Sequence, residues 1–145
     1  MNRLATALAL ALAACGGSSR PDPTIAIISP VAGATVTMAT NADKTVSLTY
    51  TLTNFTVMLV GQCSGVAGLC GHIHVLIDGT TCNDLNGDGY NNSSYSSSQA
   101  LARFALCPAP AASHTVELQL HDDVHNPVNN NAGQQVKASV AIITQ

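Results

Sequence analysis

Apolar and polar residues alternate with a period of two in several parts of the chain. Between Thr45 and Thr53, valine, leucine and tyrosine alternate with threonine and serine, which is typical of a strand buried on one face. Further strand candidates, alternating or short and apolar, lie at residues 25–28, 72–78, 100–106, 114–120 and 136–142. Beyond residue 15 no segment keeps a helical period over three turns. The pattern therefore predicts an all-β domain of about seven strands.

Two stretches of sequence indicate which type of β fold the predicted domain has. Residues 27–35 (IISPVAGAT) and residues 113–120 (SHTVELQL) resemble segments of bacterial immunoglobulin-like domains. The resemblance implies an immunoglobulin-like Greek-key sandwich over residues 24–145. It implies no function by itself, because this fold carries many unrelated functions.

The first fifteen residues differ in character from the rest. One positive charge, Arg3, precedes an uncharged and mostly apolar run that ends at Ala14, which is the layout of a secretory signal peptide. The run holds eleven residues, whereas a helix that spans a bilayer needs about 20. Residues 12–15 (LAAC) resemble the lipobox of bacterial lipoproteins. The resemblance implies that residues 1–14 are removed and that Cys15 carries the lipid.

The residues that follow Cys15 suit a membrane tether. The segment 15–23 contains small, uncharged residues at its start and is expected to be a flexible linker in front of the domain. In familiar Gram-negative bacteria, a glycine after the lipidated cysteine implies the outer membrane. An ordinary cleaved signal with a chance cysteine is the alternative interpretation. We therefore expect an exported, monomeric protein of the cell envelope, attached to a membrane through Cys15.

Charge and aromatic content exclude several partners. Of five lysine and arginine residues, Arg3 is removed with the signal, which leaves four against eight acidic residues and a formal net charge of −4. Without a basic surface, the chain is not expected to bind nucleic acid. Aromatic residues form only 3% of the chain, too few for a platform on which sugars or bases stack. No Ser-His-Asp set and no phosphate-binding glycine loop stands out, so we expect a non-enzymatic protein.

The cysteines fit an oxidising compartment. With Cys15 lipidated, an even number remains, namely Cys63, Cys70, Cys82 and Cys107. Four cysteines allow three pairings. We favour Cys63 with Cys70 and Cys82 with Cys107, because each bridge then closes one long loop. A zinc site made of four thiolates is the alternative, although the chain has no C-x-x-C pair.

All five histidines fall in two regions of the chain. His72 and His74 begin one strand candidate, whereas His114 begins a second one that leads to His121 and His125. In an immunoglobulin-like sheet these strands are antiparallel neighbours, so the start of the first lies beside the end of the second. We therefore expect His72, His74, His121 and His125 to share one patch on the outer face of the sheet. His114 is expected at the opposite end, bonded to backbone at a corner.

The histidine patch is a candidate metal site. Imidazole suits copper and zinc, and residues two apart on a strand project from the same face. Asp122 and Asp123 follow His121 directly and are placed to orient a ring nitrogen. An exposed polar face that binds no metal is the alternative.

A second resemblance concerns the same histidines. Residues 71–74 (GHIH), followed by Cys82, resemble the His-x-His strand of copper/zinc superoxide dismutases, which are β-sandwiches with copper on an outer face. Residues 118–123 (LQLHDD) loosely resemble the later strand that supplies a further copper ligand in those enzymes. The resemblance implies copper binding. The loop 80–99 contains no histidine, so the zinc-binding loop is missing and dismutase activity is not expected.

An acidic loop matches the front half of a calcium-binding loop. In residues 84–89 (DLNGDG), the oxygen ligands would be Asp84, Asn86 and Asp88. The twelfth position, where a closing carboxylate is needed, is Tyr95. We therefore expect calcium binding to be unlikely or weak and favour a turn-rich loop.

Together these features predict a non-enzymatic lipoprotein of the cell envelope whose β-sandwich carries a candidate copper or zinc site at four histidines. The second hypothesis is a structural or adhesive domain that meets another envelope protein and binds no metal. The third is a degenerate copper protein related to superoxide dismutases.

Overall fold

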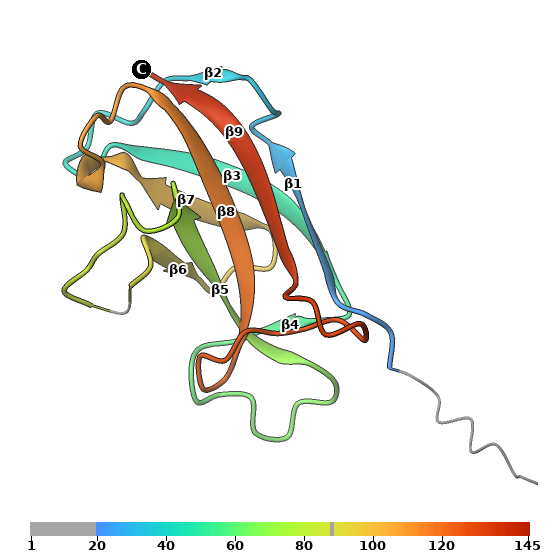
Figure 1. Ribbon diagram of the computed structural model, residues 1–145. Helices are drawn as coiled ribbons and strands as arrows, with labels where there is room; N and C mark the ends of the chain where they lie inside the picture. The colour runs from blue at the N-terminus through green and yellow to red at the C-terminus, as the bar shows by residue number, and fades with distance from the viewer. Residues whose placement is uncertain (1–19, 88) are drawn as a thin grey trace, which may run out of the picture.

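The computed structural model describes residues 20–87 and 89–145, which form β-strands joined by turns and loops (Figure 1). One sheet has the strand order β1 (Thr24–Ser29), β3 (Thr45–Thr53) and β7 (Gln99–Arg103). The other has the order β2 (Thr35–Val36), β9 (Lys137–Thr144), β8 (Ser113–Asp122), β5 (Cys70–Ile77) and β4 (Thr56–Val57). Two further elements are β6 (Asn92–Ser94), which pairs with β5, and the short 3₁₀-helix η1 (Phe104–Leu106).

Some of the predictions fall on residues that lie outside the described ranges. These are the signal peptide at residues 1–14, the lipidation site Cys15 and the calcium candidate Asp88. Among the described residues, no helix has the length and apolar character needed to cross a membrane.

The strand order confirms the predicted immunoglobulin-like sandwich. In that fold the first, second and fifth strands share one sheet, and the third, sixth and seventh share the other. Here β1, β3 and β7 form the first group, while β5, β8 and β9 pair antiparallel in the second. The described residues hold six strands of five or more residues and three shorter ones, against about seven strands predicted. The histidine-bearing strands β5 and β8 are therefore neighbours, as expected.

Alternation along the strands places one set of side chains between the two sheets. In β3, Val46, Leu48 and Tyr50 are buried, whereas the intervening serine and threonine residues are half-buried or exposed. Each fully buried apolar side chain contributes about 1.5–3 kcal/mol. The fully buried side chains of this core also come from the other sheet and η1: Ile73, Val75, Ile77, Val116, Leu118, Leu120 and Phe104.

The strand β5 differs from the others because both of its faces are buried. His72 and His74 lie on the face opposite the core, as predicted, but their expected exposure is wrong, since they are 0% and 6% exposed. The segment between β5 and β7 covers them. The Tyr90 ring stacks on His74 with centroids 3.9 Å apart, and the Tyr95 ring lies 6.0 Å from His72. The outer face of the sheet is therefore a second, partly polar interior.

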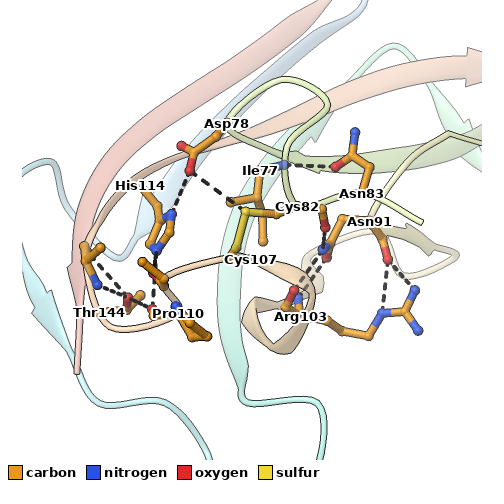
Figure 2. Close-up of a disulfide and its surroundings, with 12 residues drawn as sticks. Ile77, Asp78, Cys82, Asn83, Asn91, Arg103, Cys107, Pro110, His114 and Thr144 are labelled. Atoms are coloured by element: carbon orange, nitrogen blue, oxygen red, sulfur yellow. Dashed lines mark hydrogen bonds and ion pairs between the residues drawn. A yellow bond between two sulfur atoms is a disulfide. The ribbon is translucent and has the colours of Figure 1, made fainter. Parts of the chain in front are cut away.

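Two disulfide bonds hold the loops around this face. Cys82, in the covering segment, is bonded to Cys107 after η1 (Figure 2). Cys63 is bonded to Cys70 and closes the loop that precedes β5. These are the pairs favoured from the sequence. Two structural disulfides indicate an extracellular or periplasmic protein.

Asn91 fixes the covering segment to the first sheet (Figure 2). Its side chain is fully buried. The amide group donates to the carbonyls of Cys82 and Arg103, each at 2.8 Å, and the amide oxygen accepts the N–H of Arg103 at 2.8 Å. Because all of these groups are hydrogen-bonded, the segment is held in one position over β5.

Gly71 allows β5 and β8 to approach closely. A Cβ atom added at this position would lie 2.0 Å from the carbonyl oxygen of His121 and 2.8 Å from the Cα atom of Asp122. Both atoms belong to the backbone, so no side-chain rotation would relieve the clash. The residue before His72 must therefore be glycine if the two strands are to keep this spacing.

The variant Gly71→Ala is expected to destabilise the metal-free protein by about 3 kcal/mol, the upper end of the range for overpacking. Gly87→Ala is the matched control, because its added Cβ would meet only the Asp84 side chain at 3.6 Å. Urea unfolding measures both effects. Equal stability of the two variants would show that β5 and β8 do not need this close contact.

Candidate metal centre

Three histidine side chains meet on the covered face of β5. His72 Nε2 lies 2.9 Å from His74 Nε2 and 3.2 Å from His125 Nδ1, and the remaining distance, between His74 Nε2 and His125 Nδ1, is 3.3 Å. The first two residues belong to β5, and His125 belongs to the turn after β8. The structure thus brings together three of the four histidines assigned to the predicted patch. We call them the histidine triangle.

Hydrogen bonds alone cannot satisfy the histidine triangle. A ring nitrogen either carries a proton and donates, or has a lone pair and accepts, but it does not do both. Three such atoms in mutual contact cannot alternate between donor and acceptor. At least one of the three pairs therefore sets two donors or two acceptors against each other. A cation among the three nitrogens would bind all three lone pairs at once.

The dimensions of the histidine triangle suit a transition metal ion. Nitrogen ligands at 2.0–2.1 Å from a tetrahedral ion lie about 3.3–3.4 Å apart, and ligands at right angles lie about 2.9 Å apart. The sides of the triangle, 2.9 to 3.3 Å, cover this range. Imidazole ligands suit both zinc and copper. The distances therefore admit either of the two predicted ions.

The environment keeps two of the rings neutral. Burial, followed by the nearby rings of His125 and His121, lowers the pKa of His72 to about 4. Burial, followed by the rings of His121 and His72, lowers the pKa of His74 to about 3. Both rings are thus uncharged at neutral pH, and the neutral form is the one that binds metal. His72 Nδ1 is buried with no hydrogen-bond partner among the described residues, so the polar contacts of this ring run through Nε2.

His125 reaches β5 because the turn after β8 has an unusual conformation. Its φ angle is +67°, in the left-handed region that residues with a Cβ atom seldom adopt. The Asp122 carboxylate accepts the N–H of Val124 at 2.9 Å and that of Asn126 at 2.8 Å, which fixes the turn on both sides. Backbone strain of this kind persists only where the surroundings impose it, and it is concentrated at functional sites.

Asp123 fixes a second loop at the same end of β8. Its Oδ1 atom accepts the N–H of Gly61 at 2.6 Å and that of Gln62 at 3.2 Å. The sequence pointed to Asp122 and Asp123 as groups that orient a ring nitrogen. In the structure both carboxylates hold the main chain instead, and the position of the His125 ring follows from the turn.

His121, the fourth predicted ligand, lies beside the histidine triangle. Its ring stacks on His74 with centroids 3.8 Å apart. Its Nδ1 donates to the carbonyl of His125 at 2.9 Å, and its Nε2 lies 3.2 Å from the side-chain amide of Gln119. Burial lowers the pKa of His121 as well. His121 therefore contacts two members of the triangle and holds them in position.

An open cleft of about 450 Å³ gives access to the site. A metal held by three protein ligands keeps a further position for water or another ligand. The cleft reaches two members of the triangle, whereas the third, His72, is fully buried. Solvent and small ligands therefore approach from one side. The cleft is lined by His74, Leu76, Gly89, Tyr90, Gln119, His121 and His125.

His114 lies at the other end of β8, in a cluster whose groups already have partners (Figure 2). The sulfurs of Cys82 and Cys107 are bonded to each other. His114 Nδ1 lies 2.6 Å from Asp78 Oδ2, and its Nε2 donates to the carbonyl of Pro110 at 3.2 Å. The expected bond from His114 to backbone at this corner is confirmed, and the cluster is structural.

The acidic loop forms a turn in its described part. Asp84 Oδ1 accepts the N–H of Asn86 at 3.0 Å, which closes an Asx turn. Because Asp88 lies outside the described residues, calcium binding stays a prediction.

Comparison with known proteins gives few matches. Among solved structures, the chain is similar to fibronectin(III)-like modules of CbhA from Clostridium thermocellum, with a TM-score of 0.46 and 11% identity. The match covers 84% of this chain and 96% of that one. No family model and no curated protein matches. The fold described above therefore rests on its own strand order, and the resemblances to lipoproteins and to superoxide dismutases stay predictions.

The metal-free protein is expected to lose stability as the pH falls from about 6.5 toward about 4. Histidines in the unfolded chain take up protons near pH 6.5, whereas the pKa of His72 in the folded protein is lowered to about 4. The unfolded state then binds more protons, so the free energy of unfolding falls by up to about 1.4 kcal/mol per pH unit for each such histidine. Urea unfolding in EDTA measures this slope. The variant His72→Asn, His74→Asn should show a shallower slope, and an equal slope would assign the acid sensitivity to other groups.

Proposed function

We propose that this chain is a metal-binding protein of the cell envelope, anchored by lipid at Cys15 and holding one copper or zinc ion at the histidine triangle. The observation that carries the proposal is the mutual contact of three ring nitrogens. Hydrogen bonds would leave at least one of these contacts between two donors or two acceptors, whereas a cation bound to all three lone pairs would leave no such contact. The two disulfides support export. The lipobox-like residues 12–15 support the anchor.

The proposed role is to bind and pass on the ion. The three imidazoles would hold the ion, and the open cleft would let a donor group of a partner reach the further ligand position. Copper(II) is favoured over zinc at equal geometry by the general order of affinities. The partner is then a carrier that offers nitrogen, oxygen or sulfur ligands to the same ion.

The untagged mature domain is expected to bind one equivalent of Cu²⁺ or Zn²⁺, and His125→Ala is expected to weaken this binding by at least about 100-fold. His125 is exposed, so its loss leaves the core intact. The control is His114→Gln, at the other end of the sheet, which should bind as the wild type does. Calorimetric titration measures the affinities. Absence of bound metal in the wild type would favour a structural or adhesive domain.

The variant His121→Phe tests whether His121 binds the metal itself or only positions the other histidines. Phenylalanine keeps the ring stacked on His74 but removes the donor to the His125 carbonyl. We expect unchanged stoichiometry and an affinity about 10–100-fold weaker. Electron paramagnetic resonance of the Cu²⁺ form should show the same number of nitrogen ligands as the wild type. A loss of one nitrogen would make His121 a ligand and contradict this assignment.

A further inference from the structure

The loop between β4 and β5 lies at one end of the sandwich (Figure 1) and carries exposed apolar side chains. Residues 54–71 contain no charged side chain. Leu59 is 56% exposed and Val60 is 39% exposed. Val124, in the turn after β8, is 71% exposed. We call Leu59, Val60 and Val124 the apolar tip.

The hydrogen bonds of Asp123 hold the parts of the apolar tip together. Its carboxylate accepts the N–H groups of Gly61 and Gln62, which follow Val60, and Val124 comes directly after Asp123 in the turn that follows β8. The three apolar side chains thus belong to two loops joined at one point. Exposed apolar groups that are gathered in this way mark a contact surface more often than single ones do.

The first described residues lie against the same loop. Arg20 and Pro21 line a pocket together with Phe55 and Leu69. The side chain of Asn54 donates to the carbonyl of Asp22 at 2.8 Å. The chain before Arg20 therefore leaves the domain at the end that carries the apolar tip.

The covalent length of the chain limits how far this end lies from the proposed anchor. Arg20 is five residues after Cys15, and an extended chain spans at most about 3.3–3.6 Å per residue. The backbone of Arg20 therefore lies within about 18 Å of the lipidated residue. An anchor at Cys15 would therefore hold the end with the apolar tip within reach of the membrane, whereas η1 lies at the opposite end of the domain (Figure 1).

The acidic groups at this end are hydrogen-bonded to the main chain. The carboxylates of Asp22, Asp122 and Asp123 each accept N–H groups of the protein. The surface nearest the anchor therefore offers apolar side chains beside carboxylates that are already hydrogen-bonded. Such an apolar surface suits the interface of a zwitterionic bilayer better than a highly charged protein surface would.

From these observations we propose that the apolar tip rests in the surface of the phospholipid bilayer to which Cys15 is anchored. The inference rests on the proposed lipid anchor. It assigns the loop a partner, the lipid surface, and gives the domain one orientation on the membrane, with the histidine triangle at the membrane-facing end.

A tryptophan reporter tests the contact, because the chain contains no tryptophan. Leu59→Trp places the reporter in the apolar tip, and Leu106→Trp is the matched control, since Leu106 is 44% exposed on η1 at the far end. Both variants, in the mature lipidated form, are reconstituted in phosphatidylethanolamine and phosphatidylcholine vesicles, with and without brominated acyl chains. We expect brominated lipid to quench Leu59→Trp and its emission to shift to the blue, whereas Leu106→Trp should be unchanged.

Two other outcomes would overturn the inference in distinguishable ways. If the lipidated protein stays on the vesicles but neither reporter is quenched, the contact is wrong and the anchor stands. If mass spectrometry shows no acyl chain on Cys15 and the protein leaves the vesicles, the anchor fails and the inference fails with it. Binding of metal by the histidine triangle is measured separately and is not decided by either outcome.

Discussion

The close contact between β5 and β8 at Gly71 is the constraint on which the candidate metal centre depends. With no side chain at this position, β5 lies against the carbonyl of His121, and the register pairs His72 with His121. The same register places Asp122 at the end of β8, where its carboxylate closes the turn that returns His125 to β5. A larger residue at position 71 would therefore separate the ligands without changing any of them.

The site makes the metal-free fold less stable than it would be with an apolar interior. His72 and His74 are buried, and the contacts of their ring nitrogens cannot all be matched, which is unfavourable where the local dielectric is low. The Cys82–Cys107 bridge works in the opposite direction, because closing a loop with a separation of 25 residues adds about 3–4 kcal/mol. Unfavourable local contacts that are offset by stabilisation elsewhere in the fold are expected at functional sites.

Period-two alternation and one rule of topology were enough to predict the main strands and the meeting of the histidines. The strand Thr45–Thr53 has the bounds that its alternation indicates. The burial of His74 could not be predicted, because it depends on a segment whose path is set by Asn91 and by a bridge between residues distant in sequence. The different positions of His121 and His125 relative to the histidine triangle could not be predicted from the sequence either. They follow from a positive φ angle that tertiary hydrogen bonds impose and that residue spacing does not reveal.

The candidate metal centre and the apolar tip have a common support at the end of β8. Asp122 holds the turn of His125, while the adjacent Asp123 holds the loop of Leu59 and Val60. Because both carboxylates stand at one strand end, a displacement of the loop at a lipid surface would be passed to the turn that carries His125. In the other direction, an ion that fixed His125 would restrain the loop through the same two residues. If both proposals hold, occupancy of the histidine triangle and the seating of the tip on lipid would be coupled, and such a coupling is equal in both directions.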